Sequence, residues 1–339
     1  MKKDKSLHKK KRQWLSITIS ALVIALVLRA FFFGSYRMPS SQMENAVLRG
    51  DYLFVNKAAY GIRMPMTWLS FPFVPDSIPA LRIKTYSGIL PIPYTKIFEK
   101  RIKRNDVVLY NTPSLRKDLP VDKSPLSISR CVGLPGDSIE MQNDGYFVNG
   151  KKVAQSPDLI LPYKYRQDFD SHIISVLEKL DIPHRQTITS ANSKIRYFSR
   201  FEAYSIQEEL PDSIQIILEE REDLKYKLFI PKNGSVIKLS PEILHIYQQI
   251  ISGEQKDKAT FKNGQLYFNN KLVDSYTFTL DYYWVLSDNT YASADSRHFG
   301  FISEAQIVGK ASLIWFSKDD SRSLFRGGIR RNRIFTPIH

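Results

Sequence analysis

Four short segments carry the polar residues whose types and spacing could do chemistry. In chain order they are residues 38–61, 104–111, 129–137 and 286–310. The first opens with Met-Pro-Ser-Ser, the third contains Gly-Leu-Pro-Gly-Asp, and the fourth contains Ser-Ala-Asp-Ser-Arg. Acyl transfer by such hydroxyls needs a nucleophile with a removable proton and a base that accepts it. Each segment alone is a weak indication of the kind of protein, but all four in this order after an apolar N-terminal stretch are a strong one.

Together the four segments resemble those of signal peptidase I, the membrane-bound serine endopeptidase that removes signal peptides from exported proteins. The resemblance covers nearly the whole chain, and the long insertion, with IPKNGSVIKL and YTFTLDYYW, is similar to that of Bacteroidetes-type enzymes. It implies an antiparallel β catalytic domain interrupted by a second domain, and a Ser–Lys dyad. The partners it implies are signal peptides or preproteins, with an active signal peptidase homologue as a further candidate.

Two of the family's catalytic positions hold other residues in this chain. The resemblance places Gln42 at the position of the nucleophilic serine and Ser129 at that of the general-base lysine. Ser40 matches the serine that helps to form the oxyanion hole, and Ser293 matches the serine that orients the lysine. The remaining matches, expected to support the site structurally, are Asp288, Asp295 and Arg297.

The fourth segment departs from the family pattern at two more positions. Ser287 replaces the usual glycine before the Asp-Asn pair, and Thr290 replaces the usual arginine after it.

These departures remove the chemistry that the family uses. The amide of Gln42 is neither acidic nor a usable nucleophile, and the hydroxyl of Ser129 is too short to reach and cannot act as a base near neutral pH. The neighbouring Arg130 stays protonated, so it cannot replace the lysine. We therefore expect a catalytically impaired pseudo-peptidase that keeps the peptide-binding scaffold.

One alternative is a non-enzymatic envelope protein that uses the insertion as a binding module, and the other is an active signal peptidase with a shifted nucleophile. If the segment is extended, Ser40 and Gln42 share one face and Ser41 points away from the site. Ser41 would then need a one-residue slip and a displaced lysine, for which Lys123 is the nearest upstream residue. Ser40 lies on the correct face but one pleat away. His298 could act as a base at neutral pH, although the family usually has an aromatic side chain there.

An apolar stretch near the N-terminus must hold these segments at a membrane. Sixteen of the twenty residues in 14–33 are apolar, and a helix of that length rises about 30 Å, the thickness of a bilayer core. Seven Lys/Arg residues lie in 2–13, which predicts a cytoplasmic N-terminus and a main domain outside the inner (cytoplasmic) membrane. The length of the stretch, with no small-x-small site after it, favours one retained span over a cleaved signal.

The charge distribution favours a lipid surface over nucleic acid as the partner of the basic residues. The net charge is +15, and it concentrates at the two ends of the chain, where it suits anionic lipid. No nucleic-acid-binding motif accompanies it.

The single cysteine, Cys131, excludes an intramolecular disulfide framework, and the six histidines have no metal-ligand spacing. No glycine-rich phosphate loop is found, so no cofactor is expected.

Alternating and aromatic-rich runs predict a mainly β fold with short antiparallel strands. The expected strands are 51–57, 106–110, 235–239, 265–268 and 310–316, with a hairpin over 138–149 and helices over 171–180 and 241–251. A Pro- and aromatic-rich loop at 62–100 either lies on the membrane, lines a groove, or packs as an ordinary loop. The expected domains are a basic cytoplasmic tail (1–13), a transmembrane helix (14–33), a signal-peptidase-like core (34–150 plus 281–317), an inserted α+β domain (151–280) and a basic C-terminal tail (318–339).

Overall fold

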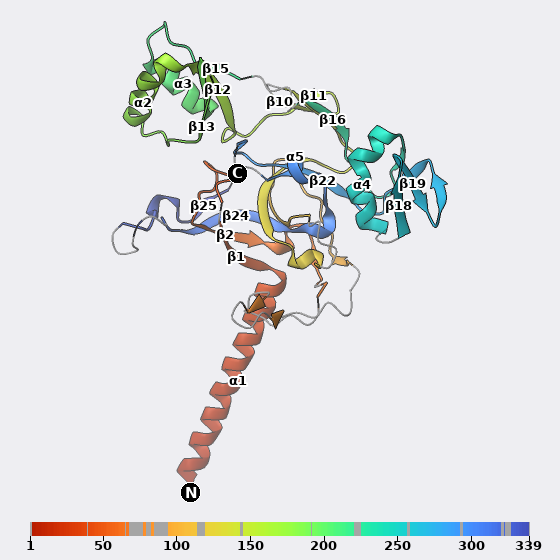
Figure 1. The fold of residues 1–339 in the computed structure, drawn as a ribbon. Helices are drawn as coiled ribbons and strands as arrows, with labels where there is room; N and C mark the ends of the chain where they lie inside the picture. The colour runs from red at the N-terminus through yellow and green to blue at the C-terminus, as the bar shows by residue number, and fades with distance from the viewer. Residues whose placement is uncertain are drawn as a thin grey trace.

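The apolar N-terminal stretch forms most of one long helix. Helix α1 (Lys2–Phe31) projects away from the rest of the chain, as Figure 1 shows. Its part Gln13–Phe31 is long and apolar enough to cross a membrane, and its most apolar window is not buried. The helix ends two residues before the predicted span does, because Phe33 already belongs to strand β1 (Phe33–Arg37).

The computed structural model describes most of the chain, and strands are its commonest elements, which confirms the mainly β fold. The described residues are 2–38, 40–64, 66–67, 77–78, 83–84, 94–113, 119–142, 145–190, 192–219, 225–255, 258–291, 294–319, 322 and 327–338. Much of the predicted loop at 62–100 lies outside them, and so does Ser293.

One antiparallel sheet holds the strands that surround the candidate site. The strand order is β1-β2-β24-β7-β8-β22-β23, and β25 also pairs with β24. The bounds are Asp51–Asn56 (β2), Val107–Asn111 (β7), Leu126–Gly133 (β8), Tyr282–Leu286 (β22), Ile302–Ser303 (β23), Ile307–Ser317 (β24) and Thr336–Pro337 (β25). Alternation places Val107 and Leu109 in one core cluster and Val108 and Tyr110 in another. Both faces of β7 in the middle of the sheet are therefore buried.

The predicted hairpin over 138–149 forms and packs against the central sheet. Strands β9 (Ser138–Gln142) and β10 (Gly145–Val148) pair antiparallel. Two more strands, β11 (Lys151–Lys152) and β16 (Tyr226–Phe229), complete a four-stranded sheet. Ile139 of β9 lies in the same core cluster as Trp284 of β22, so this small sheet covers one face of β22.

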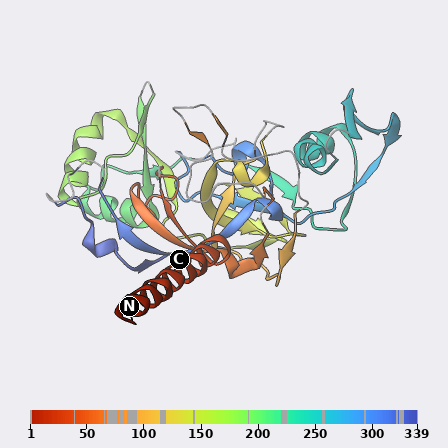
Figure 2. The ribbon, with the colours of Figure 1, turned by 90° about the horizontal axis from the view of Figure 1, so that it is seen from below.

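Apart from β11 and β16, the described helices and strands of residues 151–280 form two groups. The first group has its own core, and its elements are β12 (Ile160–Arg166), α2 (Asp170–Lys179), β13 (Thr187–Thr189), β14 (Ser193–Ser199), α3 (Arg200–Glu209) and β15 (Ile217–Leu218). The second consists of β17 (Val236–Lys238), α4 (Pro241–Gln255), β18 (Ala259–Lys262), β19 (Gln265–Phe268), β20 (Lys271–Val273) and β21 (Ser275–Thr277). Figures 1 and 2 show them on opposite sides of the central sheet, α2 and α3 in green and α4 in cyan.

The individual elements agree well with the sequence-based predictions. The predicted strands correspond to β2, β7, β17, β19 and β24, and the predicted helices correspond to α2 and α4. The first group of the insertion was predicted less completely, because neither β12, β14 nor α3 was expected. The boundaries proposed for the domains stay predictions.

The end of the basic C-terminal segment packs onto the central sheet. Ile338 is buried in the same core cluster as Leu53 and Ile314. Asp51 is completely buried, and Arg333 donates to its Oδ2 at 2.8 Å. A buried carboxylate requires such a partner, so this part of the segment is tied to the start of β2.

Candidate active site

The loop that carries Gln42 is a series of turns after β1. The amide of Glu44 donates to the carbonyl of Ser41 at 3.1 Å, and the amide of Val47 donates to that of Met43 at 2.6 Å. The expectation that this segment is extended is therefore wrong, and strand alternation cannot be used to point Ser41 away from the site. Ser40, Ser41 and Gln42 are all half-buried at the start of these turns.

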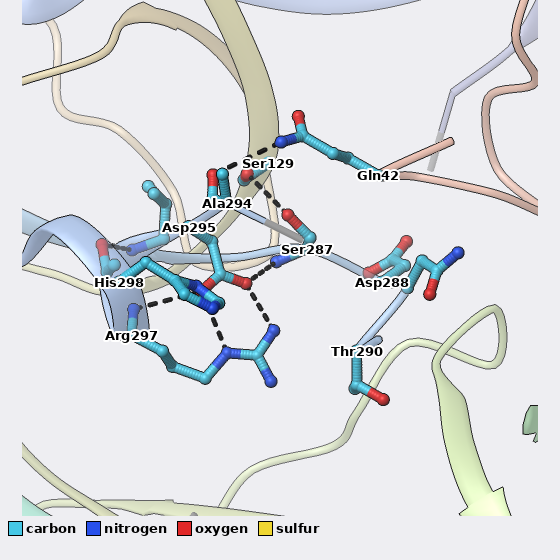
Figure 3. A network of polar contacts seen from close by, with 12 residues as sticks. Gln42, Ser129, Ser287, Asp288, Thr290, Ala294, Asp295, Arg297 and His298 are labelled. Atoms are coloured by element: carbon cyan, nitrogen blue, oxygen red, sulfur yellow. Dashed lines mark hydrogen bonds and ion pairs between the residues drawn. The ribbon is translucent and has the colours of Figure 1, made fainter. Parts of the chain in front are cut away.

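The side chain of Gln42 is tied to two neighbouring segments. Its Oε1 accepts a hydrogen bond from Ser127 Oγ at 2.8 Å, and its Nε2 donates to the carbonyl of Ala294 at 3.4 Å. Its own carbonyl accepts from the amide of Asn289 at 3.0 Å. Figure 3 shows the carboxamide reaching over Ser129 toward Ala294. The amide thus connects β8 with the fourth segment.

Ser129 lies in a buried chain of hydroxyl groups that also includes Tyr110 and Ser287. It is completely buried on β8, and its Oγ donates to the carbonyl of Ile128 at 2.7 Å. The hydroxyls of Tyr110 and Ser287 lie 3.0 Å and 3.1 Å from the same Oγ. Burial raises the pKa of Tyr110 to about 12, against the lowering effect of hydrogen bonds with Ser127 and Ser129. The Tyr110 hydroxyl is therefore protonated at neutral pH and cannot act as a base there.

Asp295 organises the backbone beside this chain. It caps the short helix α5 (Ser296–Phe299), and its Oδ1 accepts from the amide of Arg297 at 3.1 Å. The Arg297 guanidinium donates to both of its oxygens, at 2.9 Å and 2.5 Å. Its Oδ2 also accepts from the amide of Ser287 at 2.9 Å. The ion pair thereby fixes the backbone of Ser287, and with it the Ser287 hydroxyl, as Figure 3 shows.

His298, the alternative base, lies beside the same ion pair. Its Nδ1 is 3.8 Å from Oδ1 of Asp295, and its side chain is 60% exposed. It is therefore an exposed neighbour of the supporting carboxylate.

Asp288 forms a buried ion pair that the sequence did not reveal. Arg130 donates to its Oδ1 from Nε at 2.9 Å and to its Oδ2 from Nη2 at 2.6 Å. Their side chains are only 6% and 3% exposed. Since residues alternate along β8, Arg130 faces away from Ser129. The pair therefore holds the loop after β22 from the side of the sheet opposite to the hydroxyl chain.

Ser127 also belongs to the site, and the sequence reasoning missed it. It lies two residues before Ser129 on the same strand, so strand alternation places both on one face and could have indicated it. Of the matched positions, Ser129 and Asp295 both contact Ser287, and Gln42 donates to the carbonyl of Ala294, the residue before Asp295. Within the described part of the chain, no group of three or more His, Cys, Asp or Glu side chains could hold a metal ion.

One edge of β8 next to Gln42 is open. Pairing between β22 and β8 begins at Leu286 and Arg130, so among the described strands none pairs with residues 126–129 on that side. The carbonyl of Pro125 and the amide of Cys131 both bond toward β7. Backbone groups alternate in direction along an antiparallel strand, so those of Leu126 and Ile128 point to the open edge. Such an edge can accept an extended peptide as an added strand.

Comparisons with known proteins agree on one family. The family model described as signal peptidase, peptidase S26, matches residues 11–213 and 276–316. Signal peptidase I of Buchnera aphidicola subsp. Acyrthosiphon pisum is 25% identical over 312 residues, covering 91% of this chain and 76% of that protein. Signal peptidase I of Rickettsia typhi is 27% identical over 146 residues, covering 43% of this chain and 46% of that one.

A crystal structure of a signal peptidase I from Enterococcus faecalis is also similar, with 16% identity and a TM-score of 0.23. The match covers 62% of this chain and 97% of that chain. The family model spans all four of the segments that carry the polar residues.

Proposed function

The chain belongs to the signal peptidase family, peptidase S26, and from this premise we propose that it binds the signal peptides of exported preproteins without cleaving them. The binding scaffold of the family is retained in this proposal, and the Ser–Lys chemistry is lost. The observation that supports it is the arrangement of Gln42, Ser129 and Ser287, in which an amide and buried hydroxyls stand at or beside the positions predicted to be catalytic.

The absence of a base within this arrangement supports the loss of cleavage. The described partners of Ser129 Oγ are the hydroxyls of Tyr110 and Ser287 and the carbonyl of Ile128, and Ser129 is completely buried. Loss of catalytic groups in serine hydrolases leaves a residual rate due to binding and oxyanion stabilisation, with losses of about 10⁴- to 10⁶-fold in kcat. The amide of Gln42 cannot attack a carbonyl, so the residue at this position independently predicts the loss of cleavage.

The open edge of β8 supports retained peptide binding. In this proposal an extended signal peptide adds to the edge at residues 126–129 and runs past Gln42. Main-chain hydrogen bonds supply most of the affinity in this mode, and they need no catalytic residue. Leu126, which is 43% exposed, is then covered by the bound peptide.

The apolar helix α1 supports a place in the membrane. We propose that α1 keeps its basic N-terminal end in the cytoplasm and the sheet on the outer side of the inner membrane. Signal peptides emerge there at the same bilayer surface. An active signal peptidase homologue in the same membrane stays a predicted partner.

A binding and cleavage assay on the full chain tests this function. The protein is placed in lipid nanodiscs and titrated with a fluorescent signal peptide, with a scrambled peptide of equal composition as the control. We expect saturable binding of the signal peptide and its recovery intact. Cleavage that depends on Ser40 or Ser41 would instead support an active peptidase with a shifted nucleophile, and equal binding of both peptides would contradict specific binding of signal peptides.

A further inference from the structure

A buried arginine of the insertion reaches the loop that carries Gln42. Arg185 lies between α2 and β13, and its side chain is only 2% exposed. Its Nε donates to Oε1 of Glu44 at 3.1 Å, and its Nη2 donates to Oδ1 of Asn45 at 3.1 Å. Both acceptors belong to the turns that begin at Gln42, so one guanidinium holds two consecutive residues of that loop.

The same guanidinium is fixed within the insertion. It donates to both carboxylate oxygens of Glu202 at 2.8 Å, and to the carbonyl of Tyr197 at 3.1 Å. Glu202 itself forms a capping box with Ser199 at the start of α3. Bidentate pairs of this kind have a fixed geometry, so Arg185 is a rigid link between α3 and the Gln42 loop.

Glu44 passes the connection on to the fourth segment. Its Oε2 accepts from Nδ2 of Asn289 at 2.9 Å. The backbone amide of Asn289 donates to the carbonyl of Gln42, and its side chain also donates to the carbonyl of Ser41 at 3.1 Å. An unbroken series of contacts therefore runs from Arg185 through Glu44 and Asn289 to Gln42.

Three further contacts attach the insertion to the same segment. The amide of Ile160, on β12, donates to the carbonyl of Asp288 at 2.8 Å, and the carbonyl of Ile160 accepts from Thr290 Oγ1 at 2.7 Å. The rings of Tyr197 and Tyr291 lie with their centroids 4.7 Å apart. Arg185 is the charged centre of this contact area, because it compensates both Glu44 and Glu202.

We propose that Arg185 is a positioning residue that sets the conformation of the turns at 41–47, and with it the surface beside Gln42 along which a peptide added to β8 would run. The first group of the insertion is then a part of the peptide-binding site. Removing one partner of a buried ion pair leaves the other charge uncompensated, and here Glu44 and Glu202 would repel each other. Lysine cannot replace Arg185, since a point charge cannot bridge acceptors on three sides. The consequence for peptide binding rests on the proposed function, whereas the consequence for the turns does not.

Hydrogen exchange of the full chain in nanodiscs tests the proposal. In Arg185→Gln and Arg185→Lys, we expect the amides of Glu44 and Val47 to exchange at least ten times faster, and the signal peptide to bind at least ten times more weakly. Arg196→Gln is the matched control, because Arg196 is 9% exposed and pairs with Asp170 inside the same group. That variant should leave both the amide exchange of Glu44 and Val47 and the affinity for the signal peptide unchanged.

Glu44→Gln provides a second test that leaves the Arg185–Glu202 pair intact, should Arg185→Gln fail to fold. It should also speed amide exchange in the turns at 41–47. In the Arg185→Gln/Glu44→Gln double variant, these amides should exchange no faster than in the faster of the two single variants. Unchanged exchange at 41–47 in a folded Arg185→Gln or Glu44→Gln protein would overturn the proposal. Equal loosening by Arg196→Gln would overturn it too. A natural protein that binds no signal peptide would reject the proposed function, while the exchange data would still decide the role of Arg185.

Discussion

Ser129 Oγ and Ser287 Oγ lie 3.1 Å apart, although 158 residues separate them in the chain. The family resemblance predicts that these positions correspond to a lysine and a glycine in the active enzymes. The two departures therefore belong together, since the second hydroxyl occupies space that a longer side chain at 129 would need. With Gln42, they form one altered centre in which each polar group has a partner.

Restoring the lysine alone should destabilise the protein. Ser129→Lys places a long, charged side chain against the Ser287 hydroxyl in a fully buried position. Overpacking of a buried site costs about 1–3 kcal/mol, and we expect a loss of at least that size in the free energy of unfolding. Adding Ser287→Gly should recover much of it. Urea unfolding of both variants measures this, and no recovery in the double variant would contradict the packing argument.

Breaking the Arg130–Asp288 pair should be among the most destabilising single changes. Asp288→Asn leaves a buried guanidinium without its carboxylate, which costs about 3–5 kcal/mol. Asp168→Asn is the control, because the Arg166–Asp168 pair is bidentate as well but its side chains are 72% and 54% exposed. An exposed pair contributes only about 0–1 kcal/mol. Equal losses of unfolding free energy in the two variants would show that Asp288 does not support the site in this way.

Proline scanning of β8 should separate the open edge from the paired one. Leu126→Pro removes an amide that points to the open edge, so we expect the protein to fold and its affinity for a signal peptide to fall about tenfold, as for loss of about 1.4 kcal/mol. Ser127→Pro removes an amide on the β7 side and should destabilise the sheet itself. Peptide titration and thermal unfolding distinguish the two effects. Unchanged affinity in a folded Leu126→Pro protein would exclude peptide addition at this edge.

Acidification should weaken the support of the site through Asp295. Burial alone would raise the pKa of this carboxyl, but the hydrogen bonds and charge of Arg297 outweigh it and hold the pKa below its usual range. Because the folded pKa lies below the unfolded value of about 3.9, the carboxylate stabilises the fold above about pH 4. That contribution is lost as the pH falls through the folded pKa.

Urea unfolding between about pH 6 and pH 2 measures this dependence. The natural protein should be more stable than Asp295→Asn at the upper end, and the difference should narrow at the lower end. A difference in unfolding free energy that stays constant over this range would mean that Asp295 does not ionise in the folded protein as proposed.

The elements with strong local patterns could be predicted from the sequence. The hairpin β9–β10 follows from alternation on both sides of a Gln-Asn-Asp-Gly run, and the N-terminal helix follows from its apolar length. Helix α3 was missed, although Ser199 and Glu202 have the spacing of a capping box that the structure contains. Its mixed polar sequence gave no clear apolar stripe.

The conformation of the Gln42 loop could not be predicted from alternation, because alternation assumes an extended chain. Asn45 has φ of 79°, a left-handed conformation that asparagine tolerates and that ends any strand. The contact between Glu44 and Arg185 joins residues 141 positions apart. No local pattern contains such a contact, so the link between the insertion and the site required the structure.

Cleavage of a preprotein by the full chain, compared with its Gln42→Ser/Ser129→Lys/Ser287→Gly variant, tests the central claim most directly. We predict no specific cleavage by the natural protein, cleavage at the signal-peptide junction by the triple variant at least about 10³-fold faster, and little by the double variant that keeps Ser287. Efficient cleavage by the natural protein, abolished by Ser40→Ala or Ser41→Ala, would contradict the account.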